Sequence, residues 1–168
     1  MQNDPKIYVG TYEKYNNGSI KGAWLNLTEF EDKDAFTKAC FKLHADEHDP
    51  ELMFQDYENF PECFYYESST PDALWEWLEH DEDDRELISI YLENINPTTD
   101  FQLIIDRFYG CYINWDTFVS EYVLNSAILR DVPDTVAQYF DYKAYGRDLR
   151  HDFYVAETAW DKTYVWSI

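Results

Sequence analysis

Apolar and polar residues alternate over much of the first 60 positions, which predicts a small antiparallel sheet with one helix. Residues 6–12 (KIYVGTY) alternate and are rich in β-formers. Residues 20–27 (IKGAWLNL) are their expected hairpin partner across the turn signal at 16–18. Between Glu31 and Leu43 apolar residues recur at helical spacing. A third strand is predicted over 52–57.

Two further helices are predicted at 71–80 and 83–95, each with an apolar face and an acidic face. The first follows a start signal at 68–71, a hydroxyl N-cap followed by proline at the first helical position. The apolar faces comprise Leu74, Trp75 and Leu78 in the first helix, and Leu87, Ile88, Tyr91, Leu92 and Ile95 in the second. The acidic faces comprise Asp72, Glu76 and Glu79, and then Glu82, Glu86 and Glu93.

The remaining pattern mixes helices and strands. It predicts a helix over 99–109 that ends at Gly110, a helix over 114–128, a short helical piece after Pro133, and a hairpin formed by 153–158 and 163–167. Strands followed by helices and then by a mixture predict an α+β fold, divisible into as many as three sub-domains.

The distribution of charge changes this picture. The chain has 168 residues, enough for one ordinary domain or a few small ones, and its 19% aromatic content separates it from disordered acidic chains. Its net charge of −21 argues against binding to nucleic acid or to a membrane of anionic lipid, and favours cations or basic protein surfaces. Residues 43–106 hold 19 of the 34 acidic residues and a single basic residue, Arg85.

The cysteines and the hydropathy favour a cytoplasmic location. Cys40, Cys63 and Cys111 are widely spaced and form no CxxC pattern, which predicts reduced thiols. The N-terminal residues show no basic region followed by an apolar run, so no signal peptide is expected. No stretch approaches 18 apolar residues.

The acidic helix faces lack the lysines that usually accompany glutamates. Glu–Lys pairs at i,i+4 stabilise a helix by about 0.2–0.5 kcal/mol, yet residues 43–106 contain no lysine. Adaptation to high salt would spread acid over the whole surface, whereas residues 1–42 are neutral.

The spacing of these acids can be compared with the spacing of phosphates in DNA. Carboxylates at i and i+4 lie about 6 Å apart along the helix axis, and each DNA strand carries a phosphate every 3.4 Å or so. Two associated copies of this −21 chain would match the phosphate charge of about 21 base pairs. These numbers permit a DNA mimic, and they equally permit an acidic protein that binds histones or ribosomes.

Motifs for metal binding or catalysis are weak. Cys40, His44 and His48 would share one helix face as a partial zinc site, but no fourth ligand is nearby, and a buried thiol with solvent-facing histidines is the simpler interpretation. The acidic run 81–84 lacks the glycine and the ligand spacing of an EF-hand. There is no GxSxG motif or Gly-rich phosphate loop, so we predict no cofactor, no metal and no enzyme activity. A metal-dependent hydrolase, with one or two indispensable carboxylates, stays as an alternative.

Several segments of the chain resemble the ArdA antirestriction proteins. They are IYV, YNNG and KGAWL at 7–9, 15–18 and 21–25, QDYENFP at 55–61, and YFDYKAYGRDL at 139–149. The resemblance spans nearly the whole chain, at similar length and charge. Residues 62–103 match in acidity and length more than in identity.

This resemblance implies a fold and a function. ArdA-type proteins are encoded on mobile elements such as conjugative plasmids, and they mimic bent B-form DNA as elongated, curved homodimers. They occupy the DNA site of type I restriction-modification enzymes, so that incoming DNA escapes cleavage. The family fold is three small domains in a row, with the C-terminal domain making the dimer contact. The expected sub-domains are an α+β part at 1–61, an acidic helical part at 62–105 and a mixed part at 106–168.

The resemblance also implies roles for individual residues. The six acids of the two helix faces would replace phosphates, and the track would be extended by Asp46, Glu47, Asp49, Glu51, Asp56 and Glu58. Candidate dimer contacts are Tyr122, Val123, Leu124 and Ile128, for which an internal core is an equal alternative. Arg147 is expected to pair with a carboxylate such as Asp141. The alternative function is an acidic chaperone that sequesters basic proteins without geometric selectivity.

Overall fold

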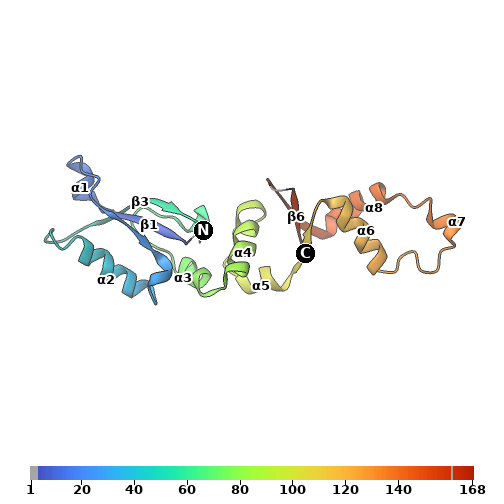
Figure 1. The fold of residues 1–168 in the computed structure, drawn as a ribbon, viewed down its shortest axis with the longest axis horizontal. Helices are drawn as coiled ribbons and strands as arrows, with labels where there is room; N and C mark the ends of the chain where they lie inside the picture. The colour runs from blue at the N-terminus through green and yellow to red at the C-terminus, as the bar shows by residue number, and fades with distance from the viewer. Residues whose placement is uncertain (1–3, 160) are drawn as a thin grey trace. The chain divides into compact units, whose positions relative to one another are not determined.

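A computed structural model describes residues 4–159 and 161–168 and confirms a mixed α+β fold. Within these residues the chain forms two three-stranded antiparallel sheets and eight α-helices (Figure 1). It divides into two compact units. The first runs to Glu93 and includes 97–99, and the second contains 94–96 and the chain from Asp100 onward. The finer division into three sub-domains stays a prediction.

The sheet of the first unit confirms the three predicted strands. The central strand β1 (Lys6–Thr11) pairs with β2 (Ala23–Asn26) on one side and with β3 (Leu52–Glu58) on the other. The register between β1 and β3 shifts by one residue next to Tyr8, so a bulge interrupts the alternation of β3. A short helix that the sequence pattern did not predict, α1 (Tyr12–Asn16), follows β1 directly.

Helix α2 (Lys33–Leu43) covers this sheet and begins at Asp32, whose carboxylate accepts a hydrogen bond from the backbone N–H of Ala35 at 2.7 Å. It buries Phe36 and Cys40. The Phe36 ring lies 5.8 Å from the Phe54 ring of β3, centroid to centroid. Two 3₁₀ turns, η1 (Leu27–Glu29) and η2 (Glu62–Phe64), complete the connections in this unit.

Helices α3 (Asp72–Glu79) and α4 (Glu82–Asn94) confirm the two predicted acidic helices, although the start of α3 differs from expectation. Pro71 is the N-cap and makes no side-chain cap bond. The hydroxyl of Thr70 instead accepts a hydrogen bond from the Trp75 indole N–H at 3.1 Å. The buried side chains of α3 are Leu74 and Trp77, so the predicted face of Leu74, Trp75 and Leu78 was only partly right.

The second unit corrects one predicted helix. Helix α5 (Phe101–Asp106) ends earlier than expected, and Phe108–Tyr112 form strand β4 instead of a last helical turn. β4 pairs with β6 (Lys162–Ser167), which also pairs with β5 (Phe153–Thr158) as the predicted hairpin. Trp160, in the hairpin connection, lies outside the described residues.

Helices α6 (Trp115–Asn125) and α8 (Tyr142–Leu149) pack against each other over this sheet, while α7 (Asp134–Ala137) is the short piece expected after Pro133. Their contact depends on Gly146, since a Cβ there would lie 2.8 Å from Cγ2 of Val119. The Trp115 indole N–H donates to the Gly146 carbonyl at 3.0 Å. The core of the unit comprises Phe118, Val119, Val123, Leu149, Phe153 and Val165. The 3₁₀ turn η3 (Arg150–Asp152) links α8 to β5.

In the described part of the chain no helix is both long and apolar enough to cross a membrane.

Candidate functional site

The acids of the two predicted helix faces are exposed on α3 and α4. Each helix buries an apolar stripe in the first unit, Leu74 and Trp77 in α3 and Leu87, Ile88 and Leu92 in α4. Because residues on the opposite side of a helix face away from such a stripe, the acids between these positions point to solvent. The exposed acids are Asp72, Glu76, Glu79, Glu82, Glu86 and Glu93.

Part of this acidity has a local structural cause. The Asp81 carboxylate accepts a hydrogen bond from the backbone N–H of Asp84 at 2.9 Å, so it caps the start of α4. Glu82 lies in the first turn, where a negative charge interacts favourably with the helix dipole. Glu86 and Glu93 lie beyond that turn, so the dipole does not explain why they are acidic.

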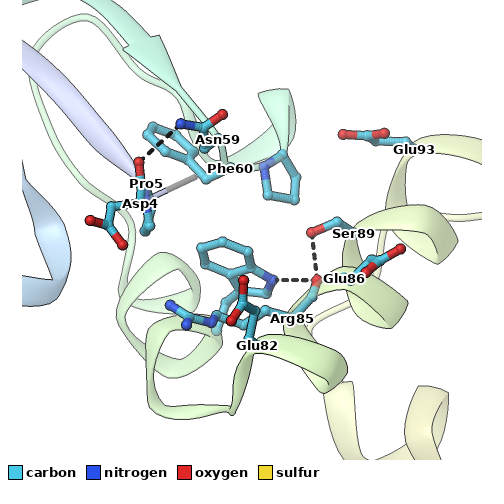
Figure 2. Close-up of a pocket in the computed structure, with 11 residues that line it drawn as sticks. Asp4, Pro5, Asn59, Phe60, Glu82, Arg85, Glu86, Ser89 and Glu93 are labelled. Carbon is cyan, nitrogen blue, oxygen red and sulfur yellow. Dashed lines mark hydrogen bonds between the residues drawn. The ribbon is translucent and has the colours of Figure 1, made fainter. Parts of the chain in front are cut away.

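A cleft of about 580 Å³ lies along the α4 side of this surface (Figure 2). Trp77 and Phe60 are buried beside it, and the Arg85 guanidinium lies 5.6 Å from the centre of the Trp77 ring. The Arg85 carbonyl accepts hydrogen bonds from the Trp77 indole at 3.2 Å and from the Ser89 hydroxyl at 2.6 Å. Acids from α4 and the N-terminal segment line the cleft: Asp4, Glu82, Glu86 and Glu93. Carboxylates around an aromatic surface form a favourable environment for a cationic side chain, such as a lysine or arginine of a partner.

Strand β3 of the first unit and the residues just before it contribute a second group of predicted acids, and a lysine partly neutralises one of them. Asp49, Glu51, Asp56 and Glu58 are all exposed. Glu58 forms an ion pair with Lys6 at 2.8 Å across β1 and β3. On α3, Asp72 is paired in the same way with Lys33 of α2, also at 2.8 Å. Such exposed pairs contribute little stability, but they reduce the negative charge offered to a partner.

Asp46 and Glu47 belong to a compact group around the Lys14 ammonium, which the sequence pattern did not reveal. Lys14 Nζ lies 2.9 Å from Asp46, 2.7 Å from Glu47 and 2.8 Å from His44 Nδ1. Lys21 also pairs with Asp46, at 2.9 Å. The Glu47 side chain is only 7% exposed, so it faces inward and has little surface to offer a partner.

The charges of this group shift its proton equilibria. Hydrogen bonds from Lys14, and secondarily from Lys21, hold the pKa of Asp46 below its usual value. The bond from Lys14 likewise lowers the pKa of Glu47. Burial, followed by the positive charge of Lys14, lowers the pKa of His44. Burial lowers the pKa of Lys14 as well, but the hydrogen bonds to Glu47 and Asp46 outweigh it and leave that pKa raised.

The partial zinc face expected from Cys40, His44 and His48 does not form on a helix. α2 ends at Leu43, so His48 is not two helical turns beyond Cys40. Cys40 and His44 are buried, whereas His48 is exposed. Burial raises the pKa of the Cys40 thiol to about 12, which keeps it protonated.

The four candidate dimer residues divide between core and surface. Val123 belongs to the core of the second unit, and the half-buried Tyr122 ring lies 5.6 Å from the Phe118 ring. Leu124 is 78% exposed and Ile128 is 39% exposed, so these two side chains are available for a contact.

The expected pairing of Arg147 with Asp141 is wrong. Asp141 caps α8, where its carboxylate accepts hydrogen bonds from the backbone N–H groups of Lys143 and Ala144. Arg147 lies 3.7 Å from Asp148, with both side chains more than three-quarters exposed. Its charge therefore has little part in shaping the unit.

Comparison with known families gives a match that covers most of the chain. The family described as Antirestriction protein (ArdA) matches residues 7–163. The matched range includes α3, α4 and the whole acidic segment 43–106. A search of curated proteins found no significant match.

Proposed function

The chain belongs to the ArdA antirestriction protein family, and we propose that the acidic surface of its first unit takes the place of DNA phosphates in the target enzyme. Proteins of this family inhibit type I restriction-modification systems, and they are inhibitors and not enzymes. The target is therefore an enzyme that has to bind duplex DNA. A polyanionic inhibitor can occupy a DNA-binding cleft by matching the charge that the cleft binds.

The exposed carboxylates of α3 and α4 are the main support for this proposal. Residues 43–106, which include both helices, contain a single basic residue, Arg85. Each acid costs some local stability through repulsion of its neighbours. A partner that reads a field of phosphates would recognise such an array without depending on any one of its members.

The contributions of the predicted acids differ. Glu47 is turned inward, and Asp46, Glu58 and Asp72 are partly neutralised by lysines. We therefore place the centre of the contact surface on α3 and α4. The exposed acids of β3 and of the residues just before it are assigned to its edge. The exposed acids of that centre, with Asp72 set aside, are Glu76, Glu79, Glu82, Glu86 and Glu93.

Competition with duplex DNA tests this function. At about 0.15 M salt, where surface charges more than about 8 Å apart are screened, the protein should displace DNA from a type I enzyme near one-to-one stoichiometry. An unrelated basic DNA-binding protein is the control and should keep its DNA. Equal displacement from both would indicate an unspecific polyanion, such as an acidic sequestering protein. Displacement from neither would contradict the proposal.

We also propose that two copies associate through the second unit, as the family resemblance implies. The end of α6 and the segment after it expose apolar side chains, including Leu124, Ile128, Val136 and Tyr139. Exposed apolar side chains that lie close together commonly mark a surface that binds another protein. The elongated, curved shape of such a dimer stays a prediction.

Analytical ultracentrifugation tests the association. Leu124→Asp should convert a dimer into a monomer, because it places a charge inside an apolar contact. Ile113→Asp is the matched control, because Ile113 is 71% exposed in the same unit and is not among the proposed contacts. A wild-type monomer, or equal dissociation of both variants, would contradict this dimer contact.

A further inference from the structure

Three potential ligand atoms in the first unit converge on one point that already holds a cation. His44 lies at the end of α2, and Asp46 and Glu47 follow in the next turn. Their ligand atoms lie within 4.8 Å of one another. His44 Nδ1, Asp46 Oδ1 and Glu47 Oε1 are each 2.7–2.9 Å from Nζ of Lys14, which reaches them from α1. The group therefore has the arrangement of a cation site with an ammonium at its centre.

The protonation of His44 prepares it to bind a metal. An ammonium can only donate hydrogen bonds, so His44 Nδ1 must accept, and its lone pair points at the centre of the group. The proton then resides on Nε2, which donates to the Val9 carbonyl at 3.3 Å. Histidines that bind metals in proteins almost always donate their second ring N–H in this way, which fixes the orientation of the ring.

Glu47 supplies a separate observation that the ammonium does not explain. Its Oε1 accepts hydrogen bonds from Lys14 and from the Thr11 hydroxyl, both at 2.7 Å. Its Oε2 is buried and has no hydrogen-bond partner, in a side chain that is only 7% exposed. A buried carboxylate oxygen without a partner is costly. Coordination of a metal by both carboxylate oxygens would satisfy it.

We propose that His44, Asp46 and Glu47 form a binding site for a divalent transition metal of the Zn²⁺ class, and that Lys14 is an internal cation which the metal displaces. One imidazole with two carboxylates is a donor set for Zn²⁺, whereas Mg²⁺ and Ca²⁺ prefer oxygen donors alone. Zn–N and Zn–O bonds are about 2.0–2.2 Å, so the ligands move inward by roughly 0.7 Å when the larger ammonium leaves. No bond of the chain is made or broken, and Lys14 keeps its proton as it moves into solvent.

A bound metal would fix one region of the first unit. His44 is hydrogen-bonded to β1 through Val9, and Glu47 is hydrogen-bonded to Thr11 at the end of the same strand. The metal would therefore tie the turn after α2 to β1, and α1 would lose the contacts that Lys14 now makes. This site lies away from the α3–α4 acids in sequence, and it does not depend on their proposed contact with the target enzyme.

Calorimetric titration of metal-free protein with Zn²⁺, in excess Mg²⁺ to saturate the general acidic surface, tests the site. One Zn²⁺ should bind per chain. His44→Gln should weaken binding about 10-fold or more. The matched variant His48→Gln changes an exposed histidine that follows the same turn, and it should leave binding unchanged. Lys14→Met should tighten binding about tenfold, because no internal cation competes.

A second pair of variants guards against loss of folding, since His44 is buried. Asp46 is 49% exposed, so Asp46→Asn should fold, as circular dichroism would verify, and it should also lose Zn²⁺ affinity. Asp49→Asn is its matched control and should bind like the wild type. Equal Zn²⁺ affinity within either pair would show that the metal is held by general surface charge and would overturn the proposal. An unchanged affinity in Lys14→Met would show that ammonium and metal do not share a site, with the same consequence.

Discussion

Replacement of the five central glutamates by glutamines is the sharpest test of the proposed contact surface. The five-fold variant changes Glu76, Glu79, Glu82, Glu86 and Glu93, all exposed on α3 and α4. Asp72 is left in place because Lys33 already neutralises part of its charge. Glutamine keeps the size and nearly the helix propensity of glutamate, so the variant removes charge with little change in helix formation, apart from the dipole interaction lost at Glu82.

The expected loss of affinity follows from Coulomb's law. Two opposite unit charges about 4 Å apart in water attract by about 1 kcal/mol, which is about a fivefold change in affinity. Distance and salt weaken the attraction between charges that lie farther apart. Neutralising one acid should therefore lower the affinity for the enzyme by a factor of roughly two to five. The five changes together should weaken inhibition of a type I enzyme about 30- to 3000-fold. Each single change should weaken inhibition only about two- to fivefold.

The assay is a DNA-cleavage inhibition titration with a matched charge control. The control variant also loses five acids, but from exposed positions in the second unit that lie outside the proposed dimer segment: Asp116, Glu121, Asp152, Glu157 and Asp161. It should weaken inhibition less than about fivefold, because those acids lie outside the proposed contact. Equal losses in both variants would refute a localised contact surface. Complete loss of inhibition from one single substitution would contradict recognition of the acids as an array, in which no one member is indispensable.

Three further predictions concern the fold. A thiol reagent should modify two cysteines of the native protein and a third only after unfolding, because burial raises the pKa of Cys40 to about 12. Gly146→Ala should lower the free energy of unfolding by about 1–3 kcal/mol in urea titrations, since its Cβ would lie 2.8 Å from Val119. Lys14 lowers the pKa of Asp46, so the stability advantage of the wild type over Asp46→Asn should be full above pH 3.8, the unperturbed value, and decline as the pH falls below it. An advantage that is the same at pH 7 and at pH 2 would contradict this linkage.

Periodicity predicted most helices and strands of this chain but could not predict pairing between distant segments. Phe101, Ile104 and Phe108 recur at helical spacing, which favoured a helix through Tyr109. The chain leaves the helix after Asp106 because Phe108–Tyr112 pair with β6, a strand at the far end of the second unit's sequence. That pairing overrides the helical spacing of the local pattern.

The candidate surface was easier to predict than the group around Lys14. Acids at helical spacing on α3 and α4 follow from the sequence alone, because an amphipathic helix must expose the face opposite its apolar stripe. Lys14 meets His44, which is 30 positions away in the chain, from a short helix that periodicity did not reveal. The family resemblance implied that Glu47 faces a partner, whereas its side chain is only 7% exposed and faces inward.

Capping explains the incorrect expectation for Arg147. Opposite charges near each other in sequence suggested an ion pair with Asp141. An aspartate directly before a helix usually binds the free backbone N–H groups of the first turn, and Asp141 does so in α8. Because α8 was not predicted, the capping role of Asp141 could not be recognised.

Carboxyl footprinting of the complex would show which acids of this chain contact the enzyme. The protein is labelled with a carbodiimide and an amine, alone and bound to a type I restriction-modification enzyme, and each modified carboxylate is located by mass spectrometry. We expect strong protection of the acids on α3 and α4, weaker protection of Asp56 and Glu58, and no protection of exposed acids such as Asp116 in the second unit. Protection that is uniform over both units, or confined to the second, would contradict a contact surface centred on α3 and α4.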